Sequence, residues 1–260
     1  MKLIYWNTNN IQRLDEIRDI LTCCKPDILF LSEIDKTLIE SDSSLNKTGY
    51  LYFPNPGCNR VSIIKKTDID ISLGLQTNYY TFINFPKFKT SVISVHLPSQ
   101  MFQHLDGLKA FIRGFRDEID ENIGNPIEHK IIVIGDFNVN PFERPMIDFD
   151  GFSATNSINS KFRKTHLGKH RAFYYNPTWK LYANNDFPGT KHYPRPSASS
   201  YDVLEHHYLD QVVISVKLLS ESTGEKIETI RKAKTYNFFS AEENKVLVSD
   251  HLPLSYTINI

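Results

Sequence analysis

The chain has 260 residues, of which 40% are hydrophobic and 12% aromatic, and its 30 basic residues balance its 30 acidic residues. This composition is typical of a globular protein and excludes the disordered class. A chain of this length can bury one large core, so we expect a single domain over residues 1–260. Because the net charge is zero, affinity for a polyanion must come from a local basic patch.

The cysteines and the apolar segments limit where the protein can act. Cys23 and Cys24 are adjacent, and Cys58 lies near Pro and Gly, so we interpret all three as small hydrophobic side chains without a disulfide or metal role. The apolar run at the start of the chain is too short for a signal peptide. No segment approaches the roughly 18 apolar residues of a membrane span. We therefore expect a cytoplasmic protein without a membrane segment.

The first hundred residues are predicted to contain one helix and several short strands. The helix has its apolar residues on one face and ends before Pro26. In chain order, we expect a strand at residues 3–6, the helix at 11–24, a buried strand at 27–31, and further strands at 61–65, 69–75, 79–85 and 90–95.

A long amphipathic helix is predicted next, over residues 101–123, followed by a buried strand at 131–134. Between residues 150 and 208 the periodicity gives way to Pro, Asn, Tyr and basic residues. A long irregular stretch inside a compact domain is more often functional than structural. Strand patterns return at 209–216, 227–234 and 254–260. Short strands with helices inserted between them predict two packed sheets flanked by helices.

Polar side chains occur at the ends of the predicted buried strands. Loops at strand ends, held in place by a rigid sheet, are where catalytic residues concentrate. In chain order, the polar residues that we expect to follow the strands are Asn7, Glu33, His96, Asp136 with Asn138, Asp210, and Asp250 with His251.

The chemistry of this set favours hydrolysis with a hard cation. Asp210 interrupts an apolar segment, and a buried Asp usually has a partner; beside a His it fixes the imidazole tautomer and stabilises the imidazolium. Oxygen-rich ligands without a Cys/His cluster favour Mg²⁺ or Mn²⁺ over zinc. Such a cation, with carboxylate, amide and imidazole groups, suits the attack of water on a phosphoester.

Six short motifs carry a resemblance to a known family: Trp6-Asn7, Leu31-Ser32-Glu33, Ser94-Val95-His96-Leu97-Pro98, Gly135-Asp136-Phe137-Asn138, Leu209-Asp210-Gln211 and Ser249-Asp250-His251. In this order they resemble the endonuclease/exonuclease/phosphatase superfamily, which has the deoxyribonuclease-like fold, and they span essentially the whole chain. The resemblance implies an α+β fold. It would be a four-layer α/β/β/α sandwich, in which two mostly antiparallel packed sheets are flanked by helices and the site lies at one edge of both sheets.

The resemblance also implies a metal site. Glu33 would be the principal ligand of Mg²⁺ or Mn²⁺, with Asn7 and Asp250 near the same ion. Asn9 occupies a second Asx position on the metal side and is included in the predicted set.

The catalytic roles follow from the same resemblance. Asp136 would orient or deprotonate the attacking water, and Asn138 would hold the phosphate or the water. His251 would stabilise the pentacovalent phosphorus and would be oriented by Asp210. His96 would contact the phosphate, although no acidic partner for it is obvious in the sequence.

One dense basic run is the candidate nucleic-acid surface. It comprises Lys161, Arg163, Lys164, Lys169 and Arg171, with Phe162 among them and two tyrosines shortly after. Cations that track phosphates beside aromatic rings that stack on bases are features of single-strand binding. The alternative interpretation is an ordinary solvated face.

The sequence therefore predicts a divalent-metal-dependent phosphoesterase, and we expect a nuclease that hydrolyses DNA or RNA phosphodiesters. The first alternative is a phosphatase for a small phosphorylated metabolite, a phosphoinositide or a nucleotide. The second is a binding module that has lost catalysis. That alternative is disfavoured by the presence of five groups together: Glu33, Asp136, Asn138, Asp210 and His251. The chain lacks the Gly-Leu-Arg-type turn of abasic-site enzymes after its first Asn. It also lacks the Trp-Cys-Asp-Arg motif of inositol-polyphosphate phosphatases.

Overall fold

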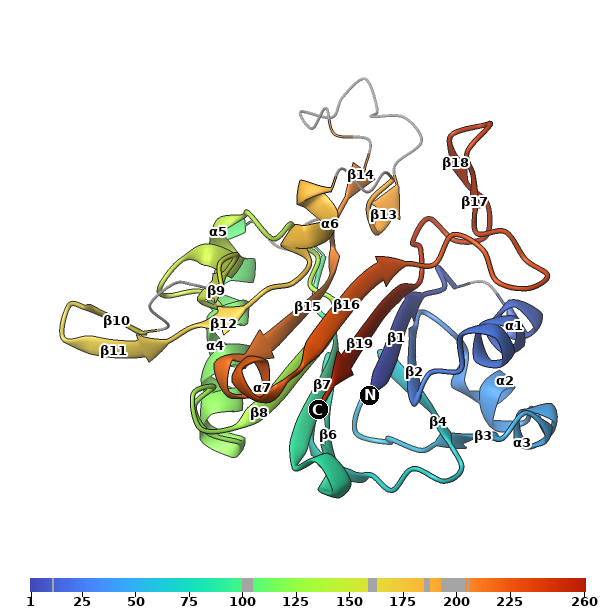
Figure 1. Cartoon of the computed structure of the whole chain (residues 1–260), viewed down its shortest axis with the longest axis horizontal. Helices are drawn as coiled ribbons and strands as arrows, with labels where there is room; N and C mark the ends of the chain where they lie inside the picture. The colour runs from blue at the N-terminus through green and yellow to red at the C-terminus, as the bar shows by residue number, and fades with distance from the viewer. Residues whose placement is uncertain (11, 100–104, 159–162, 185–187, 193–203, 205) are drawn as a thin grey trace.

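Two β-sheets packed face to face form the centre of the molecule, with helices on their outer faces (Figure 1). The computed structural model describes residues 1–10, 12–99, 105–158, 163–184, 188–192, 204 and 206–260. These ranges contain every polar residue predicted at a strand end. Of the basic residues predicted to form the nucleic-acid surface, Lys161 lies outside the described ranges.

The first sheet has six strands in the order β16-β19-β1-β2-β4-β3. Only β1 and β2 run parallel, and every other neighbouring pair is antiparallel. The strands are β1 (Lys2–Asn7), β2 (Ile28–Ser32), β3 (Tyr50–Phe53), β4 (Val61–Lys66), β16 (Gly224–Thr229) and β19 (Leu254–Asn259).

The second sheet has seven strands in the order β5-β6-β7-β8-β15-β12-β9. The pairs β7–β8 and β9–β12 are parallel, and the other pairs are antiparallel. The strands are β5 (Ser72–Gln76), β6 (Tyr80–Phe85), β7 (Thr90–His96), β8 (Lys130–Asp136), β9 (Ala154–Thr155), β12 (Tyr174–Tyr175) and β15 (Asp210–Ser215). The predicted mostly antiparallel pairing is confirmed.

Three apolar clusters define four layers. The central cluster joins the facing sides of the two sheets, for example Phe30 of β2 and Ile134 of β8. A second cluster packs the outer face of the seven-stranded sheet against α4 (Leu105–Asn122). A third packs the outer face of the six-stranded sheet against α1 (Leu14–Cys24). Burial of apolar area in these clusters drives the packing, and the predicted α/β/β/α sandwich is confirmed.

Short helices and strands lie around this sandwich. On the side of the first sheet lie α2 (Lys36–Glu40) and α3 (Ser44–Lys47), and the 3₁₀ helix η1 (Pro86–Phe88) joins β6 to β7. The remaining short elements are α5 (Arg144–Ile147), β10 (Arg163–His166), β11 (Lys169–Ala172), α6 (Trp179–Ala183), β13 (Lys191–His192), β14 (His206–His207), α7 (Val216–Glu221), β17 (Phe239–Ser240) and β18 (Lys245–Val246).

Three sequence expectations were wrong in detail. The stretch between residues 150 and 208 is not wholly irregular, because it contains β9 to β14 and α6. The strand predicted at 227–234 is β16, which begins earlier and ends at Thr229. The strand predicted at 209–216 ends at Ser215, whose side chain caps the following helix α7 by accepting a hydrogen bond from Leu218 N.

A glycine is required where β8 lies against β7. Gly135 has φ of 147°, a region that side chains rarely adopt, and it pairs with Val95. A Cβ atom on Gly135 would lie 2.0 Å from the carbonyl oxygen of Val95. The close approach of the two strands next to Asp136 therefore depends on the missing side chain.

We predict that Gly135→Ala lowers the free energy of unfolding by about 1–3 kcal/mol, because the new methyl group must displace backbone or strain φ. Urea denaturation measures the change. The matched control is Gly114→Ala in the middle of α4, where nothing lies within 4 Å of the added Cβ. That control should stabilise the protein by about 0.5–1 kcal/mol. Equal effects of the two substitutions would contradict this account.

Candidate active site

The ends of five strands bring the predicted residues to one edge of the sandwich. In the seven-stranded sheet, His96 of β7 pairs with Asp136 of β8, and Asp136 pairs with Asp210 of β15. Residues paired directly across strands point to the same face of a sheet. In the other sheet, Asn7 ends β1 and Glu33 directly follows β2. The two sheets therefore contribute polar groups to a common edge.

Asn7 and His96 join the carboxylates of the two sheets. Asn7 Nδ2 donates hydrogen bonds to Glu33 Oε1 at 3.1 Å and to Asp136 Oδ2 at 3.4 Å. His96 Nε2 lies 3.5 Å from the same Glu33 oxygen and 3.9 Å from the same Asp136 oxygen. Two carboxylates thus meet around one amide and one imidazole, which concentrates negative charge at the junction of the sheets.

The backbone around Glu33 is held in an unusual conformation. Glu33 has φ of 52°, and its carbonyl accepts a hydrogen bond from Asn10 N at 2.9 Å. Asn10 Nδ2 also donates to Glu33 Oε2 at 3.1 Å. Asn9, which the sequence placed on the metal side, contributes its backbone N–H to Asn7 Oδ1 at 3.0 Å and keeps its side chain exposed. Asn10 was not predicted from the sequence, although its side chain, like that of Asn7, donates a hydrogen bond to the Glu33 carboxylate.

Asp210 and His251 form a buried pair. The His251 Nδ1 and Asp210 Oδ2 atoms are 2.8 Å apart, and the two residues are 4% and 1% exposed. Thr190 Oγ1 accepts a hydrogen bond from Asp210 N, and Ser249 Oγ accepts one from His251 N. The backbone on both sides of the pair is therefore fixed by hydroxyl groups.

The pair keeps opposite charges together. Burial raises the pKa of Asp210 to about 6, against the opposing effect of His251. Burial lowers the pKa of His251, but the Asp210 carboxylate raises it by more, so the net pKa of His251 is above the usual imidazole value. His96 behaves differently, because burial lowers its pKa below the usual value despite the nearby Asp136 and Glu33 carboxylates. Asp210 therefore favours the protonated form of His251, whereas burial favours the neutral form of His96.

Asp210 and Asp250-His251 lie at the start of a strand, whereas they were expected to follow one. These residues do not follow buried strands: Asp210 begins β15, and Asp250 and His251 precede β19. Both strands are antiparallel to neighbours that end at the site. Their starting ends therefore reach the same edge as the finishing ends of β1 and β8.

Asp250 has a partner that the sequence did not predict. Its Oδ2 atom is paired with the ammonium group of Lys191, which lies at the start of β13. Its Oδ1 atom lies 4.0 Å from His251 Nε2. Ser249 Oγ also donates to the Asn7 carbonyl at 2.8 Å, which ties this loop to the end of β1.

Two hydrogen bonds, one from its backbone and one from its side chain, orient Asn138. Its own N–H donates to Asp136 Oδ1 at 2.8 Å, and its Nδ2 donates to the carbonyl of Leu97 at 2.8 Å. Its φ of 54° lies in the left-handed region, which Asn tolerates better than most residues. The Gly-Asp-Phe-Asn turn thus places its acid and its amide on a fixed backbone.

The predicted basic surface is a β-hairpin of β10 and β11, which projects from the molecule at the left of Figure 1. Arg163, Lys164 and Lys169 are exposed on it. Arg171 instead anchors the hairpin, because its guanidinium bonds to Asp117 of α4 at 2.5 Å and to the backbone of residues 149 and 151. The hydrogen bonds and ion pairs of the described hairpin residues run within the hairpin, to helix α4 and to the backbone of residues 149 and 151, and none joins a predicted catalytic group.

The donor set at the sheet junction fits a divalent cation. Oδ1 of Asp210 is buried and has no hydrogen-bond partner among the described residues. Among those residues, ligand atoms of Asp136, Asp210 and His251 lie within 4.8 Å of one another. Two of these three residues are hydrogen-bonded to each other, so we regard the group as a catalytic pair beside a carboxylate. The Glu33 and Asp136 carboxylates around Asn7 offer the oxygen ligands that Mg²⁺ prefers.

Residues 4–251 match the sequence profile of the Endonuclease/Exonuclease/phosphatase family. The chain belongs to that family. It is therefore a metal-dependent phosphoesterase of the nuclease and phosphatase class, as the resemblance predicted. None of the helices in the described part of the chain is long and apolar enough to cross a membrane.

Solved structures of this family share the fold at low sequence identity. TDP2 from C. elegans is 17% identical, with a TM-score of 0.61 over 100% of this chain and 75% of that one. An AP endonuclease from Archaeoglobus fulgidus is 16% identical, with a TM-score of 0.60 over the whole of both chains. The 3′ phosphatase NExo from Neisseria is 16% identical, with a TM-score of 0.53 over the whole of both chains. A comparison with curated protein sequences found no match.

We predict that Asp210→Asn lowers the turnover rate on the order of 10²- to 10⁴-fold, the range typical of positioned acid–base groups. It should also move the alkaline decline of the rate to lower pH. Removal of the carboxylate removes the interaction that raises the pKa of His251, so the imidazolium is lost at a lower pH. A pH–rate profile of both proteins measures this.

The double substitution Asp210→Asn with His251→Ala is the control. If the two side chains act as one unit, the double variant should be little slower than His251→Ala alone. Multiplicative losses would show that Asp210 acts independently of His251.

Proposed function

We propose that this family member is a nuclease that hydrolyses DNA or RNA phosphodiester bonds with Mg²⁺ or Mn²⁺, and that the whole chain forms one catalytic domain. The observation that carries the proposal is the meeting of Glu33, Asp136 and the Asp210–His251 pair at one sheet edge. The support for a nucleic-acid substrate comes from similar structures. NExo is bound to a product DNA hairpin, and TDP2 from D. rerio is complexed with a single-strand DNA product.

Glu33, Asn7 and Asp250 are the proposed metal-side residues, with the Asn9 backbone holding Asn7 in place. The hydrogen bond from Asn9 N fixes Asn7 Oδ1, and the bond from Ser249 fixes the Asn7 carbonyl. When bound, the cation supplies Lewis-acid polarisation of the phosphoryl oxygens. Asp250 is paired with Lys191, so we expect its carboxylate to be the weakest metal ligand of the three.

Asp136 is the proposed base for the attacking water. Its Oδ1 accepts from Asn138 N, while its Oδ2 faces Asn7 and His96. This arrangement leaves the carboxylate held from both sides and directed into the site. Asn138, fixed by its bond to the Leu97 carbonyl, is the proposed holder of the water or phosphate. Water attacks the phosphorus, its proton passes to Asp136, and the bond from phosphorus to the leaving oxygen breaks.

We assign to the two histidines the stabilisation of the negative charge that develops on the phosphoryl oxygens. His251 bonds Asp210 through Nδ1, so its Nε2 is the atom that faces the site and, as an imidazolium, donates to an oxyanion. A preorganised charged donor of this kind usually contributes a large share of catalysis. The neutral His96 is proposed to contact the phosphate through Nε2, which already lies beside Glu33 and Asp136.

The exposed cations of the β10–β11 hairpin are the proposed electrostatic contact to the phosphate backbone. Arg163, Lys164 and Lys169 carry this contact, with Lys161 predicted from the sequence alone. Because Arg171 is committed to Asp117, we expect its role to be the anchoring of the hairpin. The hairpin projects to one side of the sheets (Figure 1), so we expect it to contact a polymeric substrate and not a small phosphomonoester.

A substrate panel tests the function. The purified protein, with Mg²⁺ or Mn²⁺, should hydrolyse single- or double-stranded DNA or RNA, and excess EDTA should abolish the activity. The panel includes phosphomonoesters and inositol phosphates at equal concentration. Efficient hydrolysis of the small phosphomonoesters with no cleavage of nucleic acid would replace the nuclease with a phosphatase.

The same panel tests the hairpin. Neutralising Arg163 and Lys164 should weaken binding of long substrates and reduce the salt slope by roughly 0.7–0.9 per lost phosphate contact. Turnover at saturation should be retained, because neither residue lies in the metal and water site. The control is neutralisation of Lys226 on β16, which is exposed on the other sheet. An unchanged salt slope in the hairpin variant would remove the hairpin from the substrate path.

A further inference from the structure

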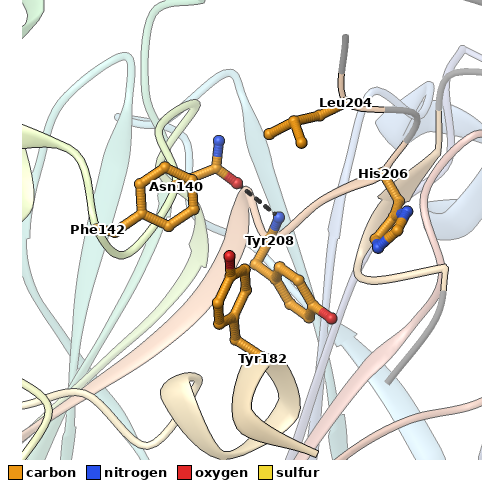
Figure 2. A pocket seen from close by; sticks show the side chains of 6 residues that line it. All are labelled: Asn140, Phe142, Tyr182, Leu204, His206 and Tyr208. Atoms are coloured by element: carbon orange, nitrogen blue, oxygen red, sulfur yellow. Dashed lines mark hydrogen bonds between the residues drawn. The ribbon is translucent and has the colours of Figure 1, made fainter. Parts of the chain in front are cut away.

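A small cavity lies beside the active site, between the loop after β8, helix α6 and the segment that leads into β15 (Figure 2). Its volume is about 230 Å³. The residues that line it are Asn140, Phe142, Tyr182, Leu204, His206 and Tyr208. Among the described residues that line it, no side chain carries a carboxylate, an ammonium or a guanidinium group.

Aromatic rings form most of the wall. The ring centroid of Tyr182 lies 5.5 Å from that of Tyr208 and 5.7 Å from that of Phe142, with interplanar angles of 71° and 58°. His206 packs against Tyr208 at 6.4 Å. Rings inclined to one another in this way present both faces and edges to the space between them. Tyr182 is 49% exposed, so one wall of the cavity is open to solvent.

The cavity is built onto the catalytic loops. Asn140 Oδ1 accepts a hydrogen bond from Tyr208 N at 2.9 Å, and Asn140 Nδ2 lies 2.9 Å from His207 Nδ1. Asn140 follows Asn138 by two residues, and Tyr208 precedes Asp210 by two. Two residues of extended chain span at most roughly 7 Å, so the Cα atoms of Tyr208 and Asp210 lie within that distance of each other.

We propose that this aromatic pocket binds the nucleobase of the nucleotide next to the scissile phosphate. The inference rests on the proposed nuclease function and deepens it. A nucleobase is planar, uncharged and small enough for the cavity, and every base presents a π-face to an aromatic side chain. Stacking of this kind is tolerant of sequence, so the pocket positions the substrate without selecting one base. A sugar phosphate or an inositol phosphate has no flat face on which these rings could stack.

Tyr182 is the residue to change, because it is half exposed and its loss should leave the core intact. Tyr182→Ala should raise KM for an oligonucleotide about 5- to 100-fold, the range expected when one base loses its stacking partner. The kcat value should change little, since no proposed catalytic group is altered. Tyr182→Phe keeps the ring and should retain the wild-type KM. Ile147→Ala is the matched control, because Ile147 is similarly exposed at 47% and does not line the cavity.

The decisive comparison uses substrates that lack a base. Two oligonucleotides each carry one abasic residue, the first on the 5′ side and the second on the 3′ side of the cleaved bond. For the oligonucleotide whose missing base would have entered the pocket, wild type and Tyr182→Ala should have the same KM. Binding in metal-free buffer supplies a second readout, in which 2-aminopurine at that position is quenched by the wild type and by Tyr182→Phe but not by Tyr182→Ala.

The outcomes separate the two proposals. If the wild type cleaves nucleic acid while Tyr182→Ala keeps its KM and its 2-aminopurine quenching, the pocket does not bind the base and the nuclease stands. If the wild type hydrolyses only phosphomonoesters that lack a base, the nuclease proposal is overturned, and the base pocket with it.

Discussion

The backbone pairing of β8 with β7 on one side and β15 on the other sets the geometry on which the site depends. This pairing places His96, Asp136 and Asp210 in one row, on the face that looks toward the other sheet. Because side chains alternate along a strand, a slip of one residue in either pairing would turn part of the row away from the site. Gly135 permits the approach of β7 at this point, since any side chain there would meet the Val95 carbonyl.

The second constraint is the burial of charge at the junction of the sheets. Below the site, the Tyr5 hydroxyl is hydrogen-bonded to Ser32 at 2.6 Å, and burial together with the Asp136 charge raises the pKa of Tyr5 well above its usual value. Tyr5 therefore stays neutral beneath the carboxylates. An acid such as Asp210 is unfavourable at 1% exposure unless it is paired, and His251 supplies that pairing. The same burial strengthens the electrostatic interactions on which hydrolysis would draw.

The parts of this architecture that were predictable from sequence are those with strong local signals. The apolar runs before Asn7, Glu33, His96 and Asp136 predicted buried strands, and these strands are present. The apolar run after Asp250-His251 also predicted a strand at 254–260, which is β19. The sequence could not reveal contacts made across long separations, such as the pairing of Lys191 with Asp250.

The hairpin shows a different limit. Its strands β10 and β11 expose both faces over most of their length, so they lack the alternation of apolar and polar residues by which a strand is recognised. The role of Arg171 was hidden for a related reason. A guanidinium in a basic run looks the same in sequence whether it faces solvent or is bound to an acid on a neighbouring helix, here Asp117. The aromatic pocket likewise joins three segments whose proximity only the fold creates.

The central claim is that the junction of the two sheets is a metal-dependent hydrolytic centre. A crystal structure of the protein with Mn²⁺, with the ion located by its anomalous scattering, tests that claim most directly. The account predicts an ion within coordination distance of the Glu33 carboxylate, beside Asn7, and with His251 still bonded to Asp210. An ion bound only elsewhere, or a junction without an ion at Mn²⁺ concentrations that support activity, would contradict it.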